Sequence, residues 1–206
     1  MFITFEGIDK SGKTTQSQIL IKKLEDNGFT VLFLREPGGT KISEKIRDLL
    51  LDNNNNEMFP STEYLLYSAS RTQLVNEVII PALKDKKVVV CDRYYDSSVA
   101  YQGYGRGIDL QIIKTLNNFA APVCPDITFF IDIDIEESNR RTARMNEEKD
   151  RLESSGDTFY NKVRKGFLSV ATAEPQRFIV LDGKESKEAL SDQIWKNVSN
   201  KLGIFK

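Results

Sequence analysis

The chain has 206 residues, with 29 Lys and Arg against 30 Asp and Glu, so its formal net charge is −1 at pH 7. This balance is a poor platform for general nucleic-acid binding, and no nucleic-acid partner is expected. The absence of histidine excludes a His-based zinc site, a Ser-His-Asp triad and a Cys-His pair. Any chemistry must come from carboxylates, Lys, Arg, hydroxyls, backbone amides or a bound hard cation.

The apolar runs and the cysteines point to an intracellular protein. No apolar run reaches the roughly 18 residues of a membrane span. The N-terminus reads MFITF and continues into a charged loop, without the basic region and cleavage site of a signal peptide. Cys91 and Cys124 form no CxxC motif and are predicted to be reduced thiols. We therefore expect a cytoplasmic location and no membrane partner.

Short apolar runs alternate with longer amphipathic segments along the chain. The apolar runs are rich in Val, Ile and Phe and suit strands that are buried on both faces of a parallel sheet. These predicted strands are Phe2–Phe5, Val31–Leu34, Val88–Cys91, Ile127–Ile131 and Phe178–Leu181.

The amphipathic segments between the strands predict helices. They are Lys13–Asn27, Thr40–Leu51, Thr62–Ile80, Asp109–Ala120, Glu136–Asn146, Thr158–Ala173 and Lys187–Leu202. Gly28 fits the residue after a helix end, Asp109 and Asp134 fit N-caps, and Pro81 is predicted to interrupt the third helix. This alternation predicts an α/β fold, a five-stranded parallel sheet with helices on both faces. We expect one domain over residues 1–206, with the polar stretch 146–157 as a mobile connector.

The first loop carries the strongest motif. Gly7–Thr14 reads GIDKSGKT, which is the G-x-x-x-x-G-K-[ST] pattern between a predicted strand and a predicted helix. Its glycines let backbone N–H groups face phosphate oxygens at the positive end of the helix. Lys13 can reach the β- and γ-phosphates, and the Thr14 hydroxyl can ligate Mg²⁺. The motif therefore predicts a bound nucleoside triphosphate.

Charged residues follow the second and third strands at the same predicted sheet edge. Asp92 closes an apolar run as a Mg²⁺-holding carboxylate does, and the fork of Arg93 can bridge two phosphates. Arg35 and Glu36 precede the sharp turn PGGT and face the same edge. Ordinary turn carboxylates and surface ion pairs are the alternative explanation of these residues.

Two segments suggest how an acceptor could be recognised. Tyr67 and Arg71 lie four residues apart on one helix face, so a ring can stack on a base while a guanidinium reaches its edge. In SSVAYQGYGRG, Gln102 can complement a thymine or uracil edge, and Tyr101 can block a ribose 2′-hydroxyl. The alternatives are core packing for the helix residues and a Gly-rich loop with incidental polar residues for the second segment.

Five segments together resemble the thymidylate kinase family. They are FEGIDKSGKTT, REPGGT, LLYSASR, CDRYYDSSVAYQG and DRLE, in the family's order and spacing from Phe2 to about Asp182. The resemblance implies ATP-dependent phosphorylation of dTMP to dTDP, with Mg²⁺ and usually as a homodimer. There are two rival functions. One is another small-molecule kinase, for example a deoxynucleoside or guanylate-type enzyme, and the other is a regulatory P-loop switch or ATP-driven partner binder.

The resemblance also assigns roles to residues. It implies that Asp9 accepts from the sugar 3′-hydroxyl, that Ser98 helps to read the base, and that 146–157 is a lid over ATP. The residues implied to bind ATP are Gly7, Ile8, Asp9, Lys10, Ser11, Gly12, Lys13, Thr14, Thr15, Arg140 and Arg144. Those implied to bind dTMP are Asp9, Arg35, Glu36, Arg47, Tyr67, Arg71, Arg93, Ser98, Tyr101 and Gln102. The implied metal residues are Thr14, Glu36 and Asp92, and the implied catalytic residues are Lys13, Arg93, Asp92 and Arg151.

The source of the transition-state cation stays open between two residues. Lys10 gives the loop a basic residue, as in eukaryotic and poxviral members, whereas REPGGT and AYQG resemble bacterial members, in which a lid arginine serves. Because a guanidinium fork matches phosphate geometry better than an ammonium, we expect Arg151 rather than Lys10 to contact the transferred phosphoryl.

Overall fold

Five parallel strands form the centre of the computed structural model, which describes residues 1–145, 151–152 and 155–204, the side chains of 144 and 145 excepted. The sheet order is β2-β3-β1-β4-β5, and every neighbouring pair is parallel. The predicted fold class is therefore confirmed. The strands are β1 (Phe2–Glu6), β2 (Val31–Arg35), β3 (Val88–Asp92), β4 (Ile127–Asp132) and β5 (Phe178–Asp182).

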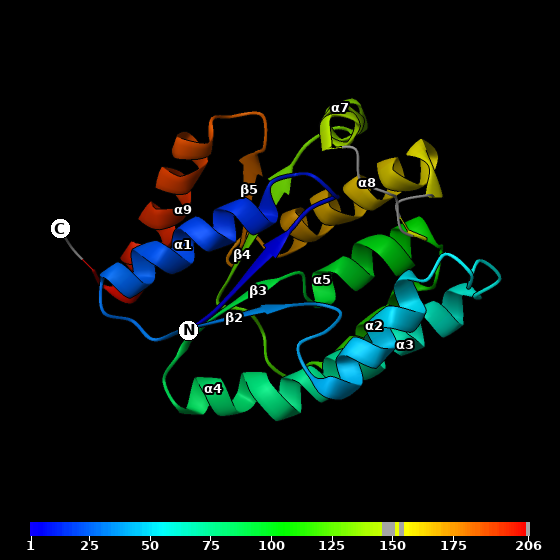
Figure 1. Cartoon of the computed structure of the whole chain (residues 1–206), viewed down its shortest axis with the longest axis horizontal. Coiled ribbons are helices and arrows are strands. Elements are labelled where there is room, and N and C mark those ends of the chain that lie inside the picture. The colour runs from blue at the N-terminus through cyan, green and yellow to red at the C-terminus, as the bar shows by residue number, and fades with distance from the viewer. Residues whose placement is uncertain (146–150, 153–154, 205–206) are drawn as a thin grey trace.

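Helices cover both faces of the sheet (Figure 1). On one face, α1 and α9 pack on strand residues such as Ile3 and Phe5. On the other face, η1 and α4 pack on Phe2, while α8 packs on Phe130. The α-helices are α1 (Lys13–Asp26), α2 (Lys41–Leu51), α3 (Pro60–Leu74), α4 (Ile80–Lys84), α5 (Tyr95–Ser98), α6 (Leu110–Ala120), α7 (Ile135–Met145), α8 (Asp157–Ala173) and α9 (Lys187–Leu202). The π-helical segments are η1 (Val75–Ile79) and η2 (Val99–Gly105).

The predicted helix ends are confirmed where a cap was named. Gly28 has φ +83° directly after the C-cap of α1. The Asp109 side chain accepts from Gln111 N at 2.6 Å, and that of Asp134 accepts from Glu137 N at 2.8 Å. Each carboxylate satisfies a backbone N–H that has no partner within its own helix.

Two local predictions were wrong. Pro81 does not interrupt the helical run, because α3 passes through the π-helical turn η1, where Ile80 N donates to Val75 O, and continues into α4. Such a turn changes the hydrogen-bond ladder where the proline lacks a donor. The alternative of a Gly-rich loop for SSVAYQGYGRG was also wrong, since α5 and η2 make most of this segment helical.

Close packing between η2 and α8 explains why two of their positions are glycine. A Cβ at Gly105 would lie 2.6 Å from the Phe159 ring, and one at Gly166 would lie 2.8 Å from Ala100 Cα. Both distances are below any van der Waals contact, so these glycines allow η2 and α8 to approach.

Within the described residues, no helix is long and apolar enough to cross a membrane. The predicted connector 146–157 falls largely on residues 146–150 and 153–154, which lie outside the described part of the chain.

Candidate active site

Two cavities open at the carboxyl ends of β1, β2 and β3, where the predicted motifs converge. One, of about 480 Å³, lies over the first loop and is lined by Asp9, Lys10, Gly12, Lys13, Thr14, Thr15, Arg35, Glu36, Arg47, Asp92 and Arg93. The second is narrower, at about 110 Å³, and includes Tyr67, Arg71, Ser98, Tyr101 and Gln102. We call them the phosphate cavity and the acceptor cavity. They share Asp9, Glu36, Arg47 and Arg93.

The first loop has the backbone that a phosphate cradle requires. Gly7 has φ +144°, and a Cβ there would lie 2.6 Å from Ile131 O. Gly12 adopts φ +105° as the residue before α1. Lys13 is 6% exposed and its Nζ donates to Ile8 O at 2.9 Å, which holds the ammonium at the loop. Burial and the neighbouring Arg93 lower the pKa of Lys13 to about 8.

The pKa of Lys13 leads to a prediction about ATP binding. Near pH 8 a substantial part of Lys13 is neutral in the free protein, and triphosphate oxygens raise its pKa by favouring the charged form. We expect ATP binding to take up a fraction of a proton at pH 8 and much less at pH 6.5. Calorimetry in buffers of different ionisation enthalpy measures this uptake. Lys13→Arg, which stays charged, should bind ATP without it, and equal uptake in both proteins would contradict the assignment.

Hard oxygen donors that fit Mg²⁺ lie beside Lys13. Thr14 Oγ1 donates to Asp92 Oδ2 at 2.7 Å, which places a hydroxyl and a carboxylate together at the edge of the phosphate cavity. Glu36 is buried, its Oε2 accepts from Arg71, and its Oε1 has no hydrogen-bond partner among the described residues. Burial raises the pKa of Glu36 even against the Arg71 charge. These groups suit a cation that keeps several waters and takes few protein ligands.

Arg93 lies between the two cavities. Its Nη1 donates to Gly7 O at 2.8 Å and its Nη2 to Asp9 Oδ1 at 2.6 Å. Its φ of +71° is unusual for a side chain of this size and marks a conformation that the surrounding structure imposes. Asp9 also accepts from Tyr160 Oη at 2.9 Å. Although burial alone would raise the pKa of Asp9, Arg93 and Lys13 outweigh it and lower that pKa.

A residue that the sequence analysis missed, Glu6, holds the Arg93 loop. Its buried carboxylate accepts from Tyr94 N at 2.8 Å and from Ser97 Oγ at 2.6 Å. Burial, with a further contribution from Asp96, raises the pKa of Glu6 to about 8. Glu6 directly follows the apolar residues of β1, and this position is the feature of the sequence that could have indicated its role.

The end of β2 and the helix α2 that follows it bring two predicted arginines to the phosphate cavity. Arg35 Nη2 donates to Glu44 Oε2 at 3.0 Å, and Arg47 Nη1 donates to Pro37 O at 2.8 Å. Glu44, which was not predicted, also accepts from Gly39 N at 2.7 Å and so fixes the turn. Both arginines project from this corner toward the phosphate cavity that they line.

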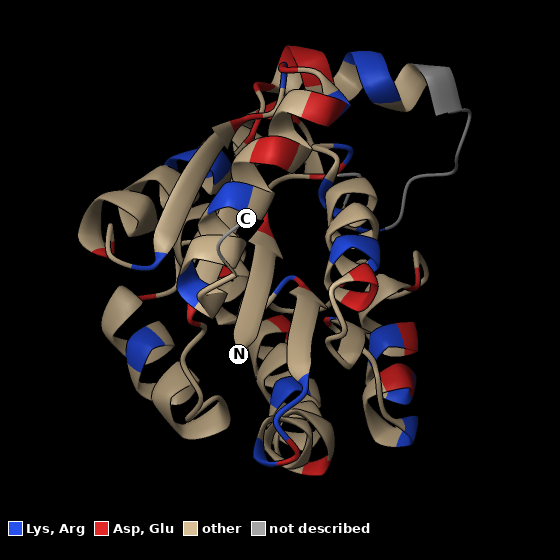
Figure 2. Cartoon of the chain, turned by 90° about the vertical axis from the view of Figure 1, so that its left-hand side faces the viewer, with Lys and Arg blue, Asp and Glu red and all other residues tan. Residues whose placement is uncertain are grey.

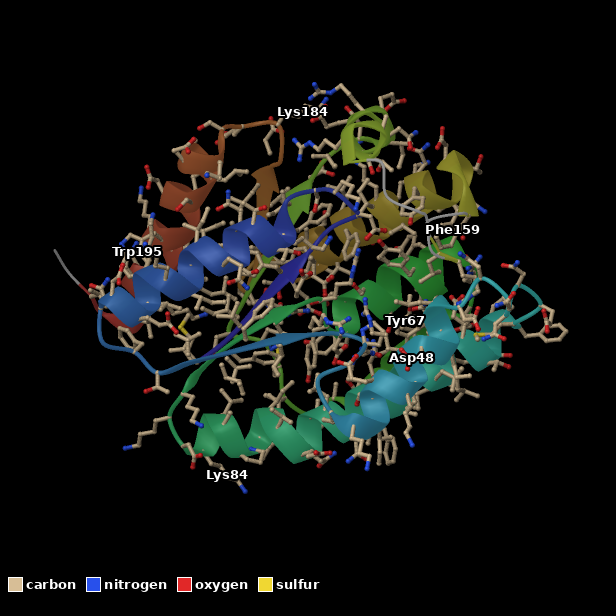
Figure 3. All side chains as sticks on the ribbon, in the orientation of Figure 1. Asp48, Tyr67, Lys84, Phe159, Lys184 and Trp195 are labelled. Carbon is tan, nitrogen blue, oxygen red and sulfur yellow. The ribbon has the colours of Figure 1, made fainter. Side chains whose placement is uncertain are left out.

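Arg71 organises the floor of the acceptor cavity. It is 2% exposed, and its Nε donates to Glu36 Oε2 at 2.7 Å. Its Nη1 donates to Ser98 Oγ at 2.9 Å, and its Nη2 donates weakly to Tyr94 O at 3.4 Å. Tyr67, on the preceding turn of α3, lines the same cavity and lies on the side of the molecule opposite Trp195 (Figure 3).

Tyr101 and Gln102 project from η2 into the acceptor cavity. The Tyr101 ring lies beneath Arg93, whose Cζ is 5.1 Å from the ring centroid, and packs on Tyr160. Gln102 is 2% exposed, and its Nε2 donates to Glu63 Oε1 at 3.0 Å. Both predicted residues therefore line the same cavity as Arg71.

The arginines of α7 differ in what they contact, and the predicted place of Arg140 and Arg144 beside ATP stays a prediction. Arg140 pairs with Glu137 and does not line the phosphate cavity, and the side chain of Arg144 lies outside the described residues. Instead, Arg141, which was not predicted, donates to Lys10 O at 3.1 Å, Ser11 O at 3.2 Å and Gly183 O at 2.6 Å. The acidic residues of this helix lie in its first turn, and the arginines follow them toward its C-terminal end (Figure 2). Arg141 thus holds the backbone of the first loop, because position 141 faces the loop while position 140 faces solvent.

Arg151 lies away from the position predicted for it. It is 7% exposed, its Nε donates to Leu50 O at 2.8 Å, and its Nη2 lies 2.8 Å from Glu63 Oε2. It does not line the phosphate cavity. In this structure Glu63 and the end of α2 take up the guanidinium, and the role of Arg151 as the charged tip of a lid stays a prediction. A contact with the transferred phosphoryl would require Arg151 to leave this position.

A phosphate-binding loop lies at the edge of a parallel sheet, and shared arginines join its cavity to a second one. This arrangement is that of a P-loop kinase of small molecules. A model of the thymidylate kinase family matches residues 5–194. The chain therefore belongs to the thymidylate kinase family, and the family predicted from its motifs is confirmed.

Individual relatives agree along nearly the whole chain. Thymidylate kinase of Kosmotoga olearia is 48% identical over 197 residues, covering 95% of this chain and 94% of the relative. That of Pelotomaculum thermopropionicum is 44% identical over 205 residues, covering 99% and 95%. The crystal structure of thymidylate kinase from Ehrlichia chaffeensis superposes with a TM-score of 0.79 at 37% identity, covering 97% of this chain and 98% of the other.

Proposed function

We propose that the chain transfers the γ-phosphoryl group of ATP to dTMP and so forms dTDP. The observation that carries this proposal is the meeting of two cavities at Asp9, Glu36, Arg47 and Arg93. A donor phosphate in one cavity and an acceptor phosphate in the other would face each other there. The acceptor is already an anion, so the reaction needs positioning and charge stabilisation rather than a general base.

On the donor side, the amides of residues 7–15 and the Lys13 ammonium would hold the triphosphate, with Arg140 and Arg144 flanking the nucleotide. Thr14, Glu36 and Asp92 would hold Mg²⁺ directly or through water. When bound, this ion neutralises charge on the β- and γ-phosphates. These assignments are supported by the hydrogen bond between Thr14 and Asp92 and by the Glu36 oxygen that has no hydrogen-bond partner in the described part of the chain.

On the acceptor side, Arg35, Arg47 and Arg93 would surround the dTMP phosphate. Asp9 would accept from the sugar 3′-hydroxyl, which requires Arg93 to share the carboxylate that it now pairs with. The Tyr101 ring would fill the space of a ribose 2′-hydroxyl and so favour deoxyribose. Its burial between Arg93 and Tyr160 keeps the ring in a fixed place.

The base would lie against Tyr67, with Arg71, Ser98 and Gln102 at its polar edge. Most N–H groups of Arg71 already serve protein acceptors, so the guanidinium is held rigidly and offers its remaining hydrogen to a base carbonyl. Gln102 is fixed by Glu63. Rigid groups of this kind lose little entropy on binding.

A panel of nucleoside monophosphates tests the proposal. We expect dTMP to be used best, then dUMP, with dCMP far behind, because cytosine has a ring acceptor where thymine has N3–H. An unpaired polar group in a closed site costs about 1–3 kcal/mol, so dCMP should lose about 5- to 150-fold in kcat/KM. A coupled assay of ADP release measures this. Equal efficiency with dCMP and dTMP would contradict the assignment of Gln102, whereas slow ATP turnover unaffected by any acceptor would favour a regulatory switch.

Three further features belong to the proposal. One kinase domain spans the chain with a lid at 146–157, the enzyme acts in the cytoplasm, and it forms a homodimer. Exposed apolar side chains on α6, among them Ile112 at 57% and Phe119 at 77%, support self-association.

A further inference from the structure

We propose that Glu63 sets the choice of base without touching it, by fixing the amide of Gln102 so that Oε1 faces the acceptor cavity. Glu63 is then a positioning residue for specificity. The inference rests on the proposed function, because it assumes that Gln102 reads the base of a monophosphate acceptor.

The position of Glu63 is fixed from several elements. It lies in the first turn of α3 and is 1% exposed. Arg106 donates to it twice, from Nε to Oε1 at 3.2 Å and from Nη2 to Oε2 at 3.1 Å, and Arg151 Nη2 lies 2.8 Å from Oε2. Arg106 is held in turn against the Phe159 ring, with its Cζ 4.6 Å from the centroid. The carboxylate therefore has little freedom to move.

An ionised carboxylate accepts hydrogen bonds and donates none. Burial alone would raise the pKa of Glu63, but hydrogen bonds from Arg106 and Gln102 outweigh it and hold that pKa below its usual value. The Gln102 group that faces Glu63 Oε1 at 3.0 Å must then be the NH₂ group. With the amide reversed, two oxygen acceptors would face each other in a buried site.

The orientation of one amide decides what the cavity offers a base. With Nε2 committed to Glu63, the other arm of the amide, Oε1, is left for a ligand in the cavity that Gln102 lines. An acceptor there complements the N3–H of thymine or uracil and opposes the bare N3 of cytosine. The reversed amide would offer N–H instead and would suit cytosine. Glu63 thus excludes cytosine through Gln102.

The test is Glu63→Gln, assayed with dTMP and dCMP. The neutral amide can accept from Gln102 Nε2 or donate to Gln102 Oε1, so the reversed orientation becomes available. We expect the ratio of kcat/KM for dCMP over dTMP to rise about tenfold or more, with the KM for ATP unchanged. Gln102→Leu should relax the same ratio, and adding Glu63→Gln to it should change the ratio no further.

Matched variants distinguish an effect on the orientation of the Gln102 amide from general damage to the fold. Glu57→Gln, in an exposed loop, should leave both efficiencies unchanged. Glu63→Gln leaves both Arg106 and Arg151 without their carboxylate partner. If the single variant is unstable, Glu63→Gln/Arg106→Gln repeats the test with one of these two cations removed. A wild-type enzyme that uses dCMP as well as dTMP would refute the proposed base reading itself. Relaxation in Gln102→Leu, but in neither Glu63 variant, would overturn the role of Glu63 and leave the proposed function intact.

Discussion

Replacing Lys13 by alanine is expected to lower kcat by about 10²–10³-fold and to weaken ATP binding. Lys13 is the buried cation of the first loop and lines the phosphate cavity beside Thr14. A preorganised donor of this kind, aimed at charge that develops in the reaction, is worth about that much in other enzymes. Steady-state kinetics at saturating dTMP give kcat, and calorimetry gives the affinity for ATP.

The control for this variant is Lys22→Ala, which removes an exposed lysine from the same helix. It should leave kcat, KM and unfolding temperature unchanged. Lys13→Ala removes the hydrogen bond to Ile8 O, so its thermal unfolding must be recorded beside the kinetics. Wild-type turnover by a folded Lys13→Ala protein at saturating ATP would refute the assignment of the loop.

The parts of the fold and site that the sequence predicted are those that depend on local pattern. Continuous apolar runs predicted all five strands. The inner strands β1, β3 and β4 are buried on both faces and so have no polar alternation, whereas the edge strands β2 and β5 are apolar although partly exposed. GIDKSGKT placed Lys13 and Thr14 at a strand-to-helix turn, since the motif encodes its own backbone. The ends of parallel strands share an edge, so Asp92 and Arg93 were predicted beside that loop, and they line the phosphate cavity.

The parts that could not be predicted depend on distant partners. Arg151 had the residue type of a lid cation, but its placement depends on Glu63 and Leu50 O, about a hundred residues earlier. Arg140 and Arg141 are neighbours in the sequence, and only the packing of α7 decides which of them faces the first loop. Glu63 belongs to no predicted motif, because nothing local in the sequence distinguishes a buried carboxylate from an exposed one.

Arg93 should be at least as important as Lys13 for the acceptor. It lines both cavities, as Arg47 does, and it also donates hydrogen bonds to Gly7 O and to Asp9 Oδ1 in the first loop. We expect Arg93→Ala to lower kcat/KM for dTMP by about 10³-fold or more, since an arginine on a transferred phosphoryl can be worth about 10³–10⁵. Arg93→Lys should recover little, because an ammonium cannot bridge two phosphates with a planar fork. ATP affinity, measured without dTMP, should change far less.

A comparison of Arg93→Ala with Arg93→Gly decides whether the guanidinium or the backbone conformation of Arg93 provides the activity. Its φ of +71° strains any residue with a Cβ and suits glycine, so Arg93→Gly removes the guanidinium and relieves the strain together. If the guanidinium provides the activity, the Ala and Gly variants should be equally impaired although the Gly variant unfolds at a higher temperature. If the strained backbone instead positions Asp9 and the loop, the Ala variant, which keeps that backbone strained, should retain more activity than the Gly variant. A loss of less than tenfold in Arg93→Ala would remove Arg93 from the transfer step and leave Lys13 and the loop amides to neutralise the phosphoryl charge.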